Sequence, residues 1–227
     1  MMLGVIQARM TSSRLPRKVL ADVAGVPMLG RQVARLRQSK RLETLVLATS
    51  DDPSDDPLAA YAQSLGLAVV RGDLPDVLGR FQRVLETYDQ ATEVARLTAD
   101  CPLTDPQVLD DLVDLRRATG ADYANNTAVR TFPHGLDVEV MTAGVLRLAA
   151  REATSAYDRE HVTPFIYGAP ERFRIAGLTR TPSLAHLRWT VDVAADLDFV
   201  RHVYGTLSDP TTEAVAALAW NSSRAAP

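Results

Sequence analysis

Residues 1–18 read MMLGVIQARMTSSRLPRK and begin with a short apolar run at residues 3–6. Such a run, followed at once by polar residues, predicts a strand buried inside a sheet. The polar residues after it include four cations and three hydroxyls, namely Arg9, Arg14, Arg17 and Lys18, and Thr11, Ser12 and Ser13. Guanidinium and ammonium groups pair well with phosphate, and ligands of open α/β sheets bind beyond the carboxyl ends of the strands. The opening stretch therefore favours a nucleotide or polyphosphate site over a solvent-exposed basic loop.

The basic cluster is a local feature of a slightly acidic chain. The 227 residues include 25 Lys and Arg and 28 Asp and Glu, which gives a formal net charge of −3. This balance argues against sequence-independent nucleic-acid binding, which depends on a basic surface. The length suffices for one sizeable core, and a single domain of this length is ordinary for an α/β fold. The cluster thus fits a small anion better than a polymer.

Cysteines, histidines and apolar runs exclude several other classes of protein. Cys101 is the single cysteine, so no intrachain disulfide and no cysteine-based zinc site is possible. The four histidines lack the i, i+4 spacing of a helical metal motif. No apolar run approaches the ~18 residues of a membrane span, and the first run is too short for a signal peptide. We therefore expect a cytoplasmic protein with no membrane partner.

Strand and helix patterns alternate through the first half of the chain. After the first strand, strands are predicted at 45–48, 68–70 and 94–97, and helices around 29–36, over 58–65, from 76 to 88 and from 106 to 118. Regular alternation is typical of a mostly parallel sheet with helices on both faces. We predict a single-domain, Rossmann-like α/β fold over residues 1–220, with a mostly parallel mixed sheet and a flexible tail at 221–227.

The pattern is less regular after Gly120. Strands are predicted at 122–127, 136–141 and 187–191, and helices at 143–152, 159–167, 194–207 and 212–220. The 159–167 helix must kink or begin near Pro164, because a proline ring clashes with the preceding helical turn. Asp137 and Glu139 alternate onto one face of their strand. That face could be exposed to solvent or line a pocket, and the pattern leaves both open.

Two aspartates stand just after predicted strands. Asp100 follows the 94–97 strand, and Asp192 follows the 187–191 strand. Either residue alone favours a turn or a helix cap. Two such carboxylates together with a phosphate-binding loop favour Mg²⁺, which proteins hold with one or two carboxylates plus substrate phosphates. Glycine is sparse in the first loop, so neither a Walker loop nor a dinucleotide fingerprint is present.

Residues 6–18 (IQARMTSSRLPRK) resemble the signature of the cytidylyltransferases that make CMP-activated sugar acids. The likeness is to the spore-coat polysaccharide cytidylyltransferase-like branch, which is related to CMP-Kdo and CMP-sialic acid synthetases. Four further segments fit that branch in the expected order, at 97–103, 134–140, 159–164 and 188–192. The resemblance covers nearly the whole chain. It implies a nucleotidyltransferase fold and a Mg²⁺-dependent cytidylyltransferase.

The resemblance also implies roles for individual residues. Four would take a direct part in the reaction, namely Arg9, Lys18, Asp100 and Asp192. Nucleotide contacts are implied for Gln7, Ala8, Arg9, Ser13, Arg14, Lys18, Arg71 and Thr98. Acceptor contacts are expected from His134, Asp137, Glu139, Arg159, His161 and Arg188. Asp100 and Asp192 match the family's Mg²⁺ ligands. Thr98 is a departure, because CMP-Kdo and CMP-sialic acid synthetases often carry Gln at this position.

The implied reaction is attack of an acceptor oxygen on the α-phosphorus of CTP, with release of pyrophosphate. Such chemistry depends mainly on positioning and charge neutralisation. Arg9 and Lys18 would neutralise the β- and γ-phosphates, and Mg²⁺ on Asp100 would polarise the α-phosphate. The expected partners are CTP and a sugar acid or related small acceptor. A homodimer is also open, since relatives are commonly dimers.

Two other functions compete with this interpretation. A nucleotide-sugar-dependent glycosyltransferase of similar fold usually needs an Asp-x-Asp metal motif, and the sequence after the 94–97 strand lacks one. A non-catalytic nucleotide-binding module would tolerate Asp100→Ala and Asp192→Ala, whereas an enzyme would lose its activity.

Overall fold

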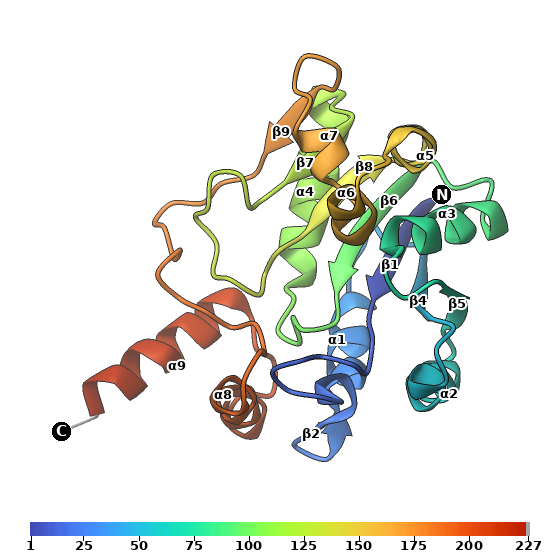
Figure 1. Ribbon diagram of the computed structural model, residues 1–227. Coiled ribbons are helices and arrows are strands. Elements are labelled where there is room, and N and C mark those ends of the chain that lie inside the picture. Colours follow the sequence, from blue (N-terminus) through green and yellow to red (C-terminus); the bar gives the residue numbers. More distant parts are fainter. Residues whose placement is uncertain (226–227) are drawn as a thin grey trace.

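A seven-stranded mixed sheet forms the centre of the structure (Figure 1). The computed structural model describes residues 1–225, with side chains as far as residue 219. The strand order is β5-β4-β1-β6-β8-β7-β9, and within the described residues β8 alone runs against its neighbours. The strands are β1 (Met2–Gln7), β4 (Thr44–Ser50), β5 (Ala68–Gly72), β6 (Glu93–Thr98), β7 (Tyr123–Asn125), β8 (Glu139–Thr142) and β9 (Ile175–Gly177). The predicted mostly parallel sheet is confirmed.

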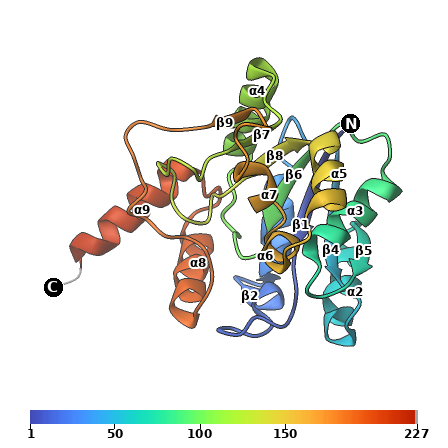
Figure 2. The ribbon, with the colours of Figure 1, turned by 45° about the horizontal axis from the view of Figure 1, so that its top comes forward.

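Helices cover both faces of this sheet, as predicted (Figures 1 and 2). They are α1 (Met28–Leu36), α2 (Asp56–Ser64), α3 (Val77–Thr87), α4 (Pro106–Thr119), α5 (Ala143–Glu152), α6 (Ala156–His161), α7 (Pro164–Tyr167), α8 (Ala194–Thr206) and α9 (Thr212–Ala225). The 3-10 turn η1 (Lys18–Leu20) and a small hairpin of β2 (Asp22–Val23) and β3 (Val26–Pro27) lie between β1 and α1 in sequence, and the 3-10 turn η2 (Pro53–Asp55) lies between β4 and α2. No helix described in residues 1–225 is long and apolar enough to cross a membrane.

Alternation along β1 divides the core into two layers. Met2 and Ile6 are buried in the layer that includes α1 and α4, and Leu3 and Val5 are buried in the layer that includes α3 and α5. Side chains alternate across a strand, so the strand is covered by apolar residues on both faces. Burial of each such side chain stabilises the fold by about 1.5–3 kcal/mol. The strand that leads into the basic loop is therefore firmly held.

Local sequence signals locate the beginnings of α3 and α4 correctly. The Asp76 carboxylate accepts a hydrogen bond from the Gly79 amide at 2.8 Å and caps α3. The Asp105 carboxylate accepts one from the Gln107 amide at 2.9 Å and caps α4, whose first residue is proline. Short polar side chains at a helix start satisfy amides that have no partner within the helix.

The strands predicted in the second half are shorter than expected. β7 ends at Asn125, because the next side chain, Asn126, donates to the Leu136 carbonyl at 2.7 Å and accepts from the Val138 amide at 2.9 Å. β8 begins only at Glu139.

The strand predicted at 187–191 is wrong. This segment makes a single bridge, between His134 and Arg188, instead of a ladder. Its apolar side chains Trp189 and Val191 are nevertheless buried, so the alternation reports their burial correctly. Burial here comes from packing of an irregular extended segment and needs no sheet pairing.

The helix predicted at 159–167 is two helices separated by a γ-turn. Val162 has φ 73° and ψ −52°, and the Thr163 amide donates to the His161 carbonyl at 2.9 Å. A β-branched residue rarely adopts a positive φ, so no pattern in the sequence predicts this break. The expected start near Pro164 is confirmed, because α7 begins there.

The C-terminal segment also differs from expectation. α9 continues past residue 220, where the predicted helix ended, to Ala225. Residues 226–227 of the predicted tail lie outside the described residues.

A buried ion pair joins β6 to β8. Glu139 is 9% exposed, and its carboxylate accepts hydrogen bonds from Arg96, from the Tyr123 hydroxyl and from the Thr163 hydroxyl at 2.7 Å. Burial alone would raise the pKa of Glu139, but the charge of Arg96 and these hydrogen bonds lower it overall. Arg96 in turn donates through Nε to Gln7 Oε1 at 2.9 Å. The structure therefore corrects the expected role of Glu139, which is enclosed by protein partners and is not placed to contact an acceptor.

Gly135→Ala should destabilise the protein by about 1–3 kcal/mol, because the φ of Gly135 is 104° and a Cβ there would lie 2.5 Å from the Thr190 backbone nitrogen. Urea unfolding measures the change. Gly177→Ala is the matched control, since its Cβ would meet nothing within 4 Å. Equal stability of the two variants would contradict the close packing of the Gly135 loop against residues 189–190.

Glu139→Gln should destabilise the protein by about 3–5 kcal/mol, because it leaves the Arg96 guanidinium buried without its counter-charge. Replacing both partners, as Arg96→Met with Glu139→Leu, should cost clearly less, because no unpaired charge then remains. A double variant less stable than Glu139→Gln would contradict this account.

The same ion pair makes stability depend on acid pH. The pKa of Glu139 is lower in the folded protein than in the unfolded chain, so its contribution is present above the ordinary carboxyl pKa of about 4.3. That contribution is lost as the pH falls through the folded pKa. The wild type should therefore lose more stability on acidification than Glu139→Gln.

Candidate active site

The basic loop after β1 is tied down by backbone hydrogen bonds. The Met10 amide donates to Asp55 Oδ1 at 2.7 Å, and the Arg17 amide donates to the Met10 carbonyl at 2.9 Å. Asp55 is itself fixed by the Thr49 hydroxyl at 2.9 Å. Arg17 takes a left-handed conformation with φ 63° immediately before η1, which begins at Lys18. The loop thus turns back sharply and brings Lys18 toward the carboxyl ends of the strands.

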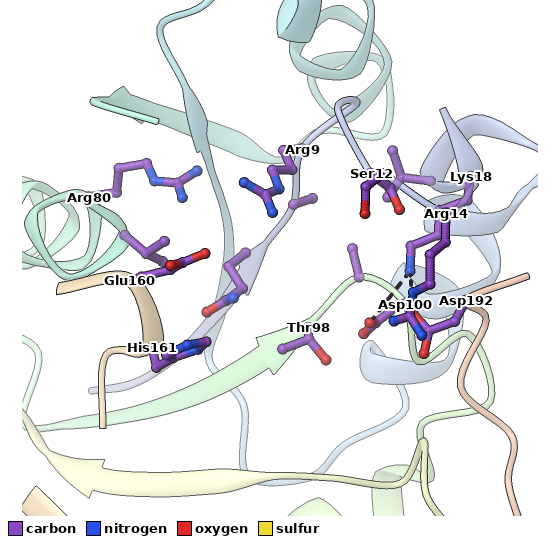
Figure 3. A pocket seen from close by; sticks show the side chains of 16 residues that line it. Arg9, Ser12, Arg14, Lys18, Arg80, Thr98, Asp100, Glu160, His161 and Asp192 are labelled. Carbon is purple, nitrogen blue, oxygen red and sulfur yellow. Dashed lines mark hydrogen bonds and ion pairs between the residues drawn. The ribbon is translucent and has the colours of Figure 1, made fainter. Parts of the chain in front are cut away.

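A cavity of about 410 Å³ lies between this loop and the ends of β1 and β6 (Figure 3). It is lined by Gln7, Ala8, Arg9, Ser12, Ser13, Arg14, Lys18, Val19, Val77, Arg80, Thr98, Ala99, Asp100, Glu160, His161 and Asp192. Gln7 and Thr98 are register partners on the adjacent strands β1 and β6. Residues from both halves of the sequence therefore share one hollow at the carboxyl edge of the sheet, where open α/β sheets bind their ligands.

Lys18 connects the two aspartates that follow predicted strands. Its side chain is buried, and Nζ donates to the Val191 carbonyl at 2.6 Å and to Asp192 Oδ1 at 3.1 Å. The same nitrogen lies 3.6 Å from Asp100 Oδ2. The loop after β1, the end of β6 and the 187–192 segment thus meet at one ammonium group, as Figure 3 shows.

Asp192 is surrounded by cations. Arg14 and Arg188 each lie 2.8 Å from its carboxylate, in addition to Lys18. Burial alone would raise the pKa of Asp192, but the hydrogen bond and charge of Lys18 and the two arginines lower it overall. The carboxylate is therefore ionised at neutral pH, which a metal ligand requires.

The side chain of Gln7 has a fixed orientation in the cavity wall. Its Oε1 accepts from Arg96, which can only donate, so the amide cannot flip without losing this bond. Its Nε2 has no protein partner in the part of the chain that the structure describes. Gln7 therefore offers a hydrogen-bond donor to a ligand.

Several residues expected in the site do not line the cavity. They are Arg71, His134, Asp137, Glu139, Arg159 and Arg188. Arg71 instead donates to the Ser50 carbonyl at 2.7 Å and pairs with Asp56 at 2.6 Å, so it holds the turn after β4.

The expected acceptor residues are mostly engaged in ion pairs or backbone pairing. Asp137 accepts two hydrogen bonds from Arg130, at 2.7 and 3.1 Å, and Arg159 pairs with both oxygens of Asp76, at 2.8 and 2.5 Å. The backbone of His134 pairs with residues 187 and 189. Arg188 stands beside the cavity through its contact with Asp192, and His161 alone of the six expected acceptor residues lines it.

Sequence reasoning missed Arg80, Glu160 and Val77 as residues of the cavity wall. Arg80 lies on the otherwise apolar face of α3, three residues after Val77 and four before Val84. A charged residue on the apolar face of a helix is the signal that could have identified Arg80, because charged side chains are rarely buried unless they have a partner. Glu160 and His161 are the last two residues of α6 and line the cavity immediately before the break at Val162.

Comparison with known proteins agrees with this geometry. Residues 3–204 match the cytidylyltransferase family. The chain is 36% identical over 212 residues to the spore coat polysaccharide biosynthesis protein SpsF of Bacillus subtilis. The matched region covers 89% of this chain and 85% of that protein. It is 30% identical over 180 residues to a 3-deoxy-manno-octulosonate cytidylyltransferase of a Bradyrhizobium species, covering 78% and 71% of the two chains.

A solved structure extends the agreement to the whole fold. The structure of a cytidylyltransferase from Leptospira borgpetersenii is 29% identical to this chain, with a TM-score of 0.92 over 98% of this chain and 95% of that one. The chain therefore belongs to the cytidylyltransferase family and is a nucleotidyltransferase.

Proposed function

We propose that this enzyme transfers CMP from CTP to a sugar acid or related small acceptor, with Mg²⁺ as cofactor and pyrophosphate as the second product. The observation that carries the proposal is the meeting of Lys18, Asp100 and Asp192 at one end of the cavity. This arrangement places a cation for phosphate next to two carboxylates that can hold a divalent metal ion.

The basic loop supplies the contacts that a triphosphate needs. Arg9, Ser12, Ser13 and Arg14 line the cavity with Lys18, and the described residues give Arg9 no carboxylate within ion-pair distance. Charge-assisted hydrogen bonds from these donors would neutralise the β- and γ-phosphates. Pyrophosphate is then a better leaving group, and the α-phosphorus becomes open to attack by an acceptor oxygen.

The carboxylates fit a magnesium site that the substrate completes. No group of three or more His, Cys, Asp or Glu side chains in the described part of the chain could hold a metal ion. Two carboxylates suffice for Mg²⁺ when substrate phosphate oxygens and water fill the remaining positions. Asp100 and Asp192 would hold the ion, which supplies Lewis-acid polarisation of the α-phosphate when bound.

An acidic acceptor is supported by the names of relatives and by the charges beside the cavity. One relative acts on 3-deoxy-manno-octulosonate according to its name. Arg188 is exposed next to Asp192, and His161 lines the cavity, so both can approach a carboxylate of the acceptor. Arg188 is itself paired with Asp192 and Asp196, but its side chain is 42% exposed, whereas that of Arg159, paired with Asp76, is 24% exposed, so Arg159 is the weaker candidate.

Incubation with CTP, Mg²⁺ and a panel of sugar acids should release pyrophosphate. Asp100→Asn should lower kcat by about 100-fold or more, because it removes one of two charges that hold the metal ion. Asp114→Asn is the matched control, since Asp114 forms an exposed pair with Arg41 whose loss costs about 0–1 kcal/mol. Failure to release pyrophosphate with any acceptor, together with failure to bind CTP, would overturn the proposal.

A further inference from the structure

Arg80 is a buried cation without adequate partners. Arg80 is 3% exposed. Two nitrogens of its guanidinium, Nε and Nη1, lack a hydrogen-bond partner within residues 1–219. Its one hydrogen bond runs from Nη2 to the Leu74 carbonyl at 3.5 Å. Buried charged groups are normally paired, because an unmade hydrogen bond leaves the full desolvation cost in place.

Two of the carboxylates that act on the charge of Arg80 are committed elsewhere, whereas Asp51 and the cavity residue Glu160 accept no hydrogen bond from it within residues 1–219. Asp76 stands one helical turn before Arg80, but it accepts two hydrogen bonds from Arg159 and one from the Gly79 amide. Asp55 accepts from the Met10 amide at 2.7 Å and from the Thr49 hydroxyl at 2.9 Å. Burial lowers the pKa of Arg80, and the charge of Arg9 lowers it further, against the opposing effect of Asp55. The protein itself therefore does not satisfy this guanidinium.

Arg80 lies at the end of the cavity opposite Lys18, Asp100 and Asp192 (Figure 3). In Figure 3, Lys18, Asp100 and Asp192 gather at one end, Arg80 lies at the other, and Arg9 lies between them. A nucleotide whose α-phosphate lies at the two carboxylates has its base elsewhere in the same cavity. The end that holds Arg80 is the place available for it.

The wall around Arg80 also fits a ring better than a phosphate. Val77 lies three residues earlier on the same helix and lines the cavity, as does Ala8 at the end of β1. An apolar surface beside a set of donors suits a flat ring with acceptors on its edge. Phosphate oxygens gain nothing from contact with Val77, because apolar atoms cannot replace their water.

We propose that Arg80 donates to the adjacent O2 and N3 acceptors of the cytosine ring, while Val77 packs against the ring face. Arginine has only donors, and N3 of cytosine is an acceptor whereas N3 of uracil carries a hydrogen. Arg80 therefore selects CTP over UTP. This assignment rests on the proposed use of CTP and adds the residue that recognises the base.

Calorimetric titration of Arg80→Met with CTP, UTP and inorganic tripolyphosphate, each with Mg²⁺, tests the assignment. CTP binding should weaken at least about tenfold, because a hydrogen bond from a charged donor is lost. The preference for CTP over UTP should fall, and tripolyphosphate binding should stay unchanged. Arg83→Met is the control on the same helix, since Arg83 is exposed and bonds to the Arg71 carbonyl at 3.1 Å.

The outcomes separate the alternatives. Equal weakening of CTP and tripolyphosphate would make Arg80 a phosphate ligand and overturn the assignment, and so would unchanged CTP binding in Arg80→Met. Thermal unfolding checks the fold, and Arg80→Met should be no less stable than the wild type because it removes an unpaired buried charge. If Arg80→Met does not fold, Arg80→Lys replaces it in the same titrations. Wild-type protein that binds neither CTP nor UTP would instead refute the proposed function itself.

Discussion

The buried ammonium group of Lys18 is the point at which three distant parts of the chain meet. It bonds to the Val191 carbonyl and Asp192, 173 and 174 residues away in sequence, and lies 3.6 Å from Asp100. A charge removed from water is costly unless it is paired. The basic loop, the end of β6 and the 187–192 segment must therefore adopt positions that bring these oxygens to Lys18. The polar end of the cavity follows from this single requirement.

Other buried charges connect elements of the sheet in the same manner. Glu139 pairs with Arg96 across β6 and β8, and Glu93 at the start of β6 accepts from Arg116 and Arg117 of α4 at 2.6 Å each. Each of these carboxylates has several donors around it, which is what makes its burial tolerable. Against this pattern, the guanidinium of Arg80 stands out because the described protein groups leave two of its nitrogens unsatisfied. Glu139 and Glu93 therefore stabilise the fold, whereas Arg80 has donors free to bind a ligand.

The first half of the fold and the position of the phosphate loop could be predicted well from the sequence. Apolar runs of four residues, helix caps such as Asp76 and the proline that starts α4 are local signals, and tertiary packing agreed with them. The 187–191 segment was predicted less well, because its alternation reports burial but not hydrogen-bond pairing. The break at Val162 has no local signal, since it needs a positive φ in a β-branched residue.

The sequence by itself determined which residues carry charge and donors, and that Asp100 and Asp192 stand after buried segments. It could not determine which charges face each other, because an arginine forms an ion pair equally well with a neighbour or with a ligand. Only the tertiary structure decided that Arg71, Arg159 and Glu139 form ion pairs with other protein side chains, whereas two guanidinium nitrogens of Arg80 have no hydrogen-bond partner among the described residues. The physical reason is that both the pairing of a charge and its access to the cavity depend on packing between elements far apart in the chain, so Lys18 and Asp192 line the cavity although they are paired, whereas Arg71 and Arg159 do not.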